Sequence, residues 1–174
     1  MKKMLLLVIL TVMSASCMGQ KVNNTPTKNF SLEKFLGTWY EISRFDHSFE
    51  RGLNYCTAEY SMNDDGTLTV LNSGLKNGKY KSSKGKAKVT DTTGLLRVSF
   101  FGPFYSDYRV LKIWGDYRYA LIGSGSDKYL WILSRTPEVP DNVLNEITDN
   151  AFRRGYKTEN LIWVEQNVQG VNFE

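Results

Sequence analysis

Residues 37–53 read GTWYEISRFDHSFERGL, an aromatic strand pattern that runs directly into a charged segment. The first eight residues contain the bulky pair Trp39 and Tyr40 and have the alternation of a β-strand. After Arg44 the alternation stops, and phenylalanines are mixed with acidic, basic and histidine side chains. The stretch therefore predicts a strand that ends in a loop with both apolar and charged groups.

From Phe30 onward, strand-like segments recur at intervals of about 8–12 residues, separated by turn signals. The clearest, NYCTAEYSM at 54–62, has an apolar face that alternates with a mostly polar one. Tight turns are predicted at 63–66 and 91–94, whereas the lysine-rich run 74–84 predicts a long basic loop. Short turns alternate with longer connections, so we expect one tightly connected end and one end with longer loops. This pattern predicts an all-β fold, an eight-stranded up-and-down antiparallel β-barrel with room for one small ligand.

After the eighth strand the apolar period changes from that of a strand to that of a helix. Pro140-Asp141 is typical of a helix start. The apolar stripe that follows consists of Val143, Leu144, Ile147, Ala151 and Phe152. One C-terminal α-helix is therefore expected to pack on the outside of the barrel, against Tyr40 and Ile42. A short final strand is expected at 161–164.

The first sixteen residues have the pattern of a secretory signal peptide, with two lysines, a short apolar run and small residues before Cys17. Cys17 in this position favours lipidation, as in bacterial lipoproteins, over plain cleavage that leaves a secreted protein, and Met18 after it favours the outer membrane. We expect a signal peptide at 1–16, a tether at 17–29 and one domain at 30–174. Cleavage lowers Lys+Arg from 22 to 20 against 18 acidic residues, and a net charge of +2 gives no support to nucleic-acid binding.

Three motifs along this pattern resemble the signatures of the lipocalin family. They are Gly37-Thr38-Trp39, Gly115-Asp116-Tyr117 and Arg135 after Leu133-Ser134. The segments RFDHSFERGL, SFFGPFY and YLWILSRTP are similar to the bacterial outer-membrane lipoprotein lipocalins, relatives of apolipoprotein D. The resemblance implies a cavity that binds fatty acids or lysophospholipids, on a protein held at the periplasmic face of the outer membrane. It also implies that Trp39 closes the barrel floor and that Arg135 lies across it as a structural residue.

Strand alternation assigns fourteen side chains to the expected ligand-binding cavity. They are Cys56, Ala58, Tyr60, Met62, Leu68, Val70, Val89, Leu96, Val98, Phe100, Ile122, Tyr129, Trp131 and Leu133. Glu41 and Ser43 also face inward in this register. A buried Glu41 requires a partner, and the sequence does not name one.

Basic and aromatic side chains are expected together at the open end, above the apolar interior. A ligand with a hydrocarbon tail and an anionic head suits both parts, because buried methylene groups supply affinity and charge pairs supply specificity. The residues expected to hold the head are Arg44, Arg51, Lys76 and Lys128. The lysine-rich run from Lys76 to Lys88 is interpreted as a solvated surface, with contact to a membrane or to lipopolysaccharide as the alternative.

Other function classes find less support in the sequence. His47 is the only histidine, so an enzyme of lipid metabolism would depend on His47 or Cys56, and alternation assigns Cys56 to the core. The chain has neither metal-ligand spacing nor a phosphate-binding loop, so no metal or cofactor is expected. A third class is a structural envelope protein with a filled barrel. The expected partners are one small hydrophobic ligand and the outer membrane, with no nucleic acid, and we expect a monomer or weak dimer.

Overall fold

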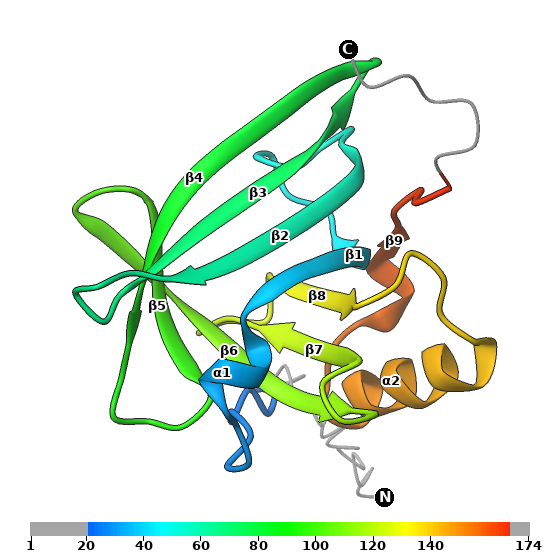
Figure 1. Ribbon diagram of the computed structural model, residues 1–174. Coiled ribbons are helices and arrows are strands. Elements are labelled where there is room, and N and C mark those ends of the chain that lie inside the picture. Colours follow the sequence, from blue (N-terminus) through cyan, green and yellow to red (C-terminus); the bar gives the residue numbers. More distant parts are fainter. Residues whose placement is uncertain (1–20, 168–174) are drawn as a thin grey trace, which may run out of the picture.

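The computed structural model describes residues 21–167, which form a closed β-barrel with one helix against its outer face (Figure 1). The strands are β1 (Gly37–Phe45), β2 (Asn54–Met62), β3 (Leu68–Lys76), β4 (Lys79–Val89), β5 (Leu95–Phe101), β6 (Phe104–Trp114), β7 (Tyr119–Gly123), β8 (Leu130–Ser134) and β9 (Leu161–Trp163). The helices are α1 (Leu32–Phe35), α2 (Asp141–Arg153) and the 3₁₀ turn η1 (Thr158–Asn160). No helix in the described part of the chain is long and apolar enough to cross a bilayer.

Sequence neighbours from β2 to β8 pair antiparallel, and β1 pairs with both β8 and β2 to close the barrel. The predicted eight-stranded up-and-down barrel with one outer helix and a short final strand is therefore confirmed. Near the floor β1 and β2 pair directly, with Trp39 opposite Ala58. Further up they separate, and β9 pairs with β1 in place of β2.

The side chain of Gln166 bridges β1 and β2 where these strands separate. Its Nε2 donates to the backbone carbonyl oxygens of Glu41 and Cys56, both at 2.8 Å. The amide of Tyr55 adds a bond to the carbonyl of Glu165 at 2.7 Å. The segment after β9 therefore forms part of the barrel wall.

A bulge in β1 sets which of its side chains enter the barrel. Glu41 and Ser43 pair with consecutive residues of β8, so β1 carries one extra residue at this point. Glu41 and Arg44 consequently face the interior, whereas Ser43 faces outward and donates to the carbonyl of Ile162 at 2.9 Å. The prediction that Ser43 faces the interior is wrong, because strict alternation does not anticipate a bulge.

Two connections predicted as long loops are tight turns. β3 and β4 are joined by Asn77–Gly78, whose φ angles of 53° and 74° suit a two-residue hairpin of type I′. The predicted basic loop is therefore a pair of strands, which Figure 1 shows as the long β3–β4 hairpin. β5 and β6 are joined by Gly102–Pro103. The longer connections at the open end are 46–53 and 124–129.

Helix α2 covers an apolar cluster on the outer face of the barrel. Ile147 and Ala151 are fully buried there, and Ile42 and Tyr40 pack in the same cluster, as predicted. Phe152 is 66% exposed, so its assignment to this stripe is wrong. Because it follows Ala151 by one residue, it points about 100° away around the helix.

The segment 22–29 packs along the outside of the barrel, although it was predicted to belong to a free tether. The side chain of Val22 is 9% exposed and lies in the outer apolar cluster. The amide of Thr27 donates to the carbonyl of Val110 in β6 at 2.8 Å. Cys17 and the predicted signal peptide lie outside the described residues.

Candidate functional site

One end of the barrel is closed by an indole and a guanidinium group. The guanidinium carbon of Arg135 lies 3.8 Å from the centre of the Trp39 ring, in cation–π geometry. The Nη atoms of Arg135 donate to the carbonyl oxygens of Thr38, Lys34 and Leu36 at 2.7–2.8 Å. Trp39 and Arg135 therefore lie together at the floor, as the resemblance implies, and connect β1, α1 and the end of β8.

An aromatic layer lies next to this floor. Phe35 of α1 is completely buried, with its ring centre 4.9 Å from that of Trp39 and 5.1 Å from that of Tyr60. The hydroxyl groups of Tyr60 and Tyr108 are 2.7 Å apart, and burial raises the pKa of both phenols. Both tyrosines also line the space above, so the layer forms its base.

Above the aromatic layer the barrel contains a cavity of about 640 Å³. Nine of the side chains assigned to the cavity by alternation line it. They are Cys56, Ala58, Tyr60, Val70, Val98, Phe100, Tyr129, Trp131 and Leu133. Pockets of about 300–1,000 Å³ typically hold small-molecule ligands, so this volume is sufficient for one.

The other five assigned side chains do not line the cavity. Leu68, Leu96 and Ile122 are fully buried in the packed part of the barrel interior. Met62 and Val89 end their strands and are 45% and 49% exposed. These assignments are corrected because alternation identifies the face of a strand on which a residue lies but not its height in the barrel.

Much of the cavity wall from β3 to β6 is polar, which the sequence reasoning did not anticipate. The polar lining includes Asn72, Ser73, Lys81, Ser82, Ser83, Ser99 and Ser106. Asn72 Oδ1 and Ser99 Oγ are buried without a hydrogen-bond partner within residues 21–167. The sequence of β4 contained a signal for this wall, because Lys84, Lys86 and Lys88 alternate with small residues that face inward.

Arg44 lies inside the barrel wall and not at the rim, where it was predicted. It is 3% exposed, and its Nη1 lies 2.6 Å from Glu41 Oε1. Its Nη2 donates to the carbonyl oxygens of Glu50 and Leu53 at 2.8 and 3.1 Å. The bulge turns Arg44 inward, where it is the partner that buried Glu41 requires. The two bonds to carbonyls also fix the β1–β2 loop.

Burial shifts the pKa of Glu41 in this pair and that of Cys56 beside it. Burial and the nearby Glu50 carboxylate raise the pKa of Glu41, and Arg44 offsets part of the shift. Burial, with a further contribution from Glu41, raises the pKa of the Cys56 thiol to about 12. Cys56 is therefore protonated at neutral pH, where a thiolate nucleophile would be needed for catalysis. Within residues 21–167, no group of three or more His, Cys, Asp or Glu side chains is arranged to hold a metal ion.

Aromatic rings and a carboxylate meet where the β1–β2 loop approaches β8. His47 stacks on Phe49 with ring centres 3.9 Å apart, and Tyr129 stacks on Trp131 at 5.8 Å. Glu50 Oε2 accepts a hydrogen bond from Trp131 Nε1 at 3.1 Å and lies 3.0 Å from His47 Nε2. His47 is only 7% exposed, so it is part of the packing of the loop.

The predicted basic rim residues are separated in the structure. Lys76 lines the cavity and is joined there by Lys81. Arg51 is exposed and pairs with Asp46 at 2.8 Å, and Lys128 is exposed on the β7–β8 loop outside the lining. The cations that line the cavity therefore lie on the β3–β4 hairpin and not on the β1–β2 loop.

Comparisons of this chain with known proteins all indicate one family. A family model for a lipocalin-like domain matches residues 30–166. The outer membrane lipoprotein Blc of Escherichia coli (strain K12) is 49% identical over 146 residues, which cover 82% of each chain. The protein of the same name from Vibrio cholerae is 42% identical over 165 residues, covering 92% of this chain and 96% of the relative. Apolipoprotein D of Mus musculus is 32% identical over 150 residues, covering 80% and 78%.

This chain belongs to the lipocalin family, as its three motifs indicated. Lipocalins are generally proteins that bind small hydrophobic ligands. Among solved structures, insecticyanin from the tobacco hornworm Manduca sexta matches with a TM-score of 0.72 over 90% of this chain and 91% of its own. The two sequences are 21% identical, so this similarity concerns the fold alone.

Proposed function

We propose that this protein carries a fatty acid or a lysophospholipid in its barrel cavity, while lipidated Cys17 anchors it to the periplasmic side of the outer membrane. Relatives named as outer membrane lipoproteins support the location. Membership of the lipocalin family supports a hydrophobic ligand. The observation that carries the proposal is a cavity of about 640 Å³ with an apolar part and a charged part.

The apolar part of the cavity suits a hydrocarbon chain. Ala58, Val70, Val98 and Leu133 line it with side chains that form no hydrogen bonds. Each methylene group buried there contributes roughly 0.8 kcal/mol, so about twelve of them contribute roughly 10 kcal/mol. Association and ordering offset several kcal/mol of this gain. The tail therefore supplies most of the affinity.

The charged part of the cavity suits an anionic head. Lys76 and Lys81 line the wall on the β3–β4 hairpin, where their ammonium groups can donate to a carboxylate or a phosphate. A Cβ at Gly52 would lie 3.6 Å from Lys76 Cε, so Lys76 lies beside the β1–β2 loop at the open end. The Oδ1 of Asn72, which has no hydrogen-bond partner within residues 21–167, can accept a hydrogen bond from a hydroxyl group of a lysophospholipid head on the same wall.

The two alternative functions have less support. A structural envelope protein with a filled barrel would not need a hollow of this size. A lipid-metabolising enzyme would need a reactive side chain, but Cys56 is protonated at neutral pH and His47 is packed between Phe49 and Glu50.

Substitution of Ser83 by tryptophan tests the proposal, with Lys84→Trp as the matched control. Ser83 lines the cavity, so an indole there would occupy space that the ligand needs. Lys84 is the next residue of β4 and is exposed outside the lining. Calorimetric titration should show at least tenfold weaker binding of palmitate and of a lysophospholipid to Ser83→Trp, and unchanged binding to Lys84→Trp. Equal binding by both variants, or no lipid uptake by the unmodified protein, would contradict a carrier.

A further inference from the structure

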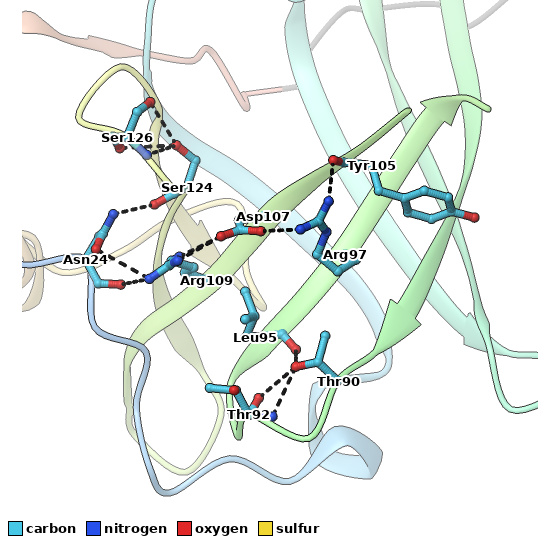
Figure 2. A network of polar contacts seen from close by, with 10 residues as sticks. All are labelled: Asn24, Thr90, Thr92, Leu95, Arg97, Tyr105, Asp107, Arg109, Ser124 and Ser126. Carbon is cyan, nitrogen blue, oxygen red and sulfur yellow. Dashed lines mark hydrogen bonds and ion pairs between the residues drawn. The ribbon is translucent and has the colours of Figure 1, made fainter. Parts of the chain in front are cut away.

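The segment 22–29, here called the N-terminal strap, is held to the barrel by a polar network (Figure 2). Asn24 Nδ2 donates to the carbonyl of Ser124 at 3.0 Å, and Arg109 Nη1 donates to the carbonyl of Asn24 at 3.3 Å. Arg109 is positioned in turn by Asp107, with Nη2 and Oδ2 2.8 Å apart. The strap is therefore attached to β6 and to the β7–β8 loop.

The beginning of the strap is also attached to the C-terminal end of α2. The amide of Asn23 donates to the carbonyl of Arg154 at 2.8 Å. Arg154 Nη1 donates to the carbonyls of Asn23 and Thr25 at 3.0 and 3.2 Å. A Cβ at Gly155 would lie 3.6 Å from the Cα of buried Val22. The chain is thus fixed to one side of the barrel from Val22 onward.

This attachment limits the distance between the barrel and its proposed anchor. Cys17 precedes Val22 by five residues. An extended chain spans at most roughly 3.5 Å per residue, so a lipid anchor on Cys17 would reach no further than about 18 Å from Val22. A domain of this length is about 40 Å across. An acyl anchor on Cys17 would therefore hold the side of the barrel that carries Val22 near the membrane.

The surface at this point carries three basic side chains and one aromatic side chain, which we call the helix-end patch. It consists of Lys21, Phe152, Arg153 and Lys157, all of them exposed. Phe152 is 66% exposed although it is a large apolar residue. The acidic residues nearby are Asp149 and Glu159 on the same segment and Asp127 on the β7–β8 loop. The three cations of the patch and the adjacent Arg154 outnumber them, so the patch is net positive. One exposed phenylalanine is ordinary on a protein surface, but Phe152 lies close to the proposed anchor, where it could contact lipid.

We propose that the helix-end patch lies on the membrane surface, with Phe152 at the boundary of headgroups and acyl chains and with the cations against anionic lipid headgroups. The inference rests on the proposed lipidation of Cys17. Asn24 also contacts the β7–β8 loop at the open end of the barrel. The same orientation therefore holds the mouth of the cavity close to the lipids from which a ligand would enter.

Fluorescence quenching in vesicles tests this orientation. Acylated full-chain protein is reconstituted into vesicles of phosphatidylethanolamine and phosphatidylglycerol that contain a spin-labelled lipid. In a Cys56→Ala background, a fluorophore is attached at Phe152→Cys or, as matched control, at Lys84→Cys on β4, across the barrel from α2 (Figure 1). Quenching at position 152 should be at least threefold stronger than at position 84. Equal quenching, or stronger quenching at 84, would overturn the proposal.

Two further variants distinguish the contribution of the anchor to this orientation from that of the patch. Insertion of a twelve-residue Gly-Ser segment after Gly19, and separately the double charge reversal Arg153→Glu with Lys157→Glu, should each lower the quenching preference for position 152. A preference that survives both changes would overturn the assignment of this patch. Mass spectrometry of the protein reports acylation, and palmitate titration reports the cavity. Protein without acyl groups on Cys17 would contradict the proposed anchor together with this orientation, whereas acylated protein with equal quenching would overturn the orientation alone.

Discussion

Replacement of Arg44 by methionine should destabilise the fold, because Arg44 is a buried partner and not a headgroup ligand. The substitution removes the 2.6 Å ion pair with Glu41 and the hydrogen bonds to the carbonyls of Glu50 and Leu53. Loss of one partner of a buried ion pair costs about 3–5 kcal/mol. Because the raised pKa of Glu41 lets it take up a proton, we expect about 3 kcal/mol. For a chain of this size, that corresponds to a melting temperature lower by about 6–12 °C.

The matched double variant, Glu41→Gln with Arg44→Met, should recover at least half of the lost stability. It leaves no buried charge without a partner, and a double-mutant cycle then isolates the coupling between the two side chains. Urea unfolding followed by circular dichroism measures all four free energies. The folded-state pKa of Glu41 is raised above its unfolded value, so the stability of Arg44→Met should fall as pH rises above the ordinary carboxyl range. The double variant should lack this dependence.

Two results would contradict this role of Arg44. If the free energy of unfolding of Arg44→Met lies within about 1 kcal/mol of that of the unmodified protein, the cost assigned to a broken buried pair is wrong. If it also loses affinity for palmitate but keeps its affinity for an uncharged alcohol of the same chain length, Arg44 contacts the ligand head as the sequence first indicated. Both measurements use the same purified variant.

Three other predictions concern the floor, the thiol and the seam of the barrel. Arg135→Ala should lower the free energy of unfolding by about 3 kcal/mol, because three charge-assisted bonds to carbonyls and the stacking on Trp39 are lost. The control Arg118→Ala, at an exposed site, should change the free energy of unfolding by less than about 0.5 kcal/mol. Equal effects of the two substitutions would contradict the role of Arg135 in the floor. Cys56 should react with a disulfide reagent at pH 8 at least a hundredfold more slowly than free cysteine, because burial raises its pKa to about 12; a rate equal to that of free cysteine would show an accessible thiolate. Gln166→Ala should lower the free energy of unfolding by about 2 kcal/mol, because two buried carbonyls lose their donor. It should also speed amide hydrogen exchange along the separated parts of β1 and β2. Amides that stay protected there would show that the seam closes without Gln166.

Local patterns in the sequence were sufficient for the architecture. The period-two alternation in 54–62 and the helical stripe that contains Ile147 and Ala151 each depend on residues close together in the chain. Backbone geometry imposes these periods on any strand or helix with one buried face. The pairing of Trp39 with Arg135 was also accessible, but only through the resemblance to a family, since 96 residues separate them.

The site depended on features that local periodicity does not contain. One extra residue in β1 turned Arg44 from the expected rim into the wall, because a single bulge exchanges the faces of all later residues in a strand. The height of Leu68 or Met62 within the barrel depends on how far neighbouring strands are staggered, and that stagger is fixed by pairing across the sheet.

The remaining features arise from contacts between distant parts of the chain. Gln166 closes the seam by bonds to the backbone of Glu41 and Cys56, over sequence separations of 125 and 110 residues. The strap is a mostly polar segment that becomes a fixed part of the surface, because Arg154 and Ser124 supply its hydrogen-bond partners. Periodicity reports which side of an element is buried, whereas the partner of a polar group is chosen by the folded backbone that brings the two together.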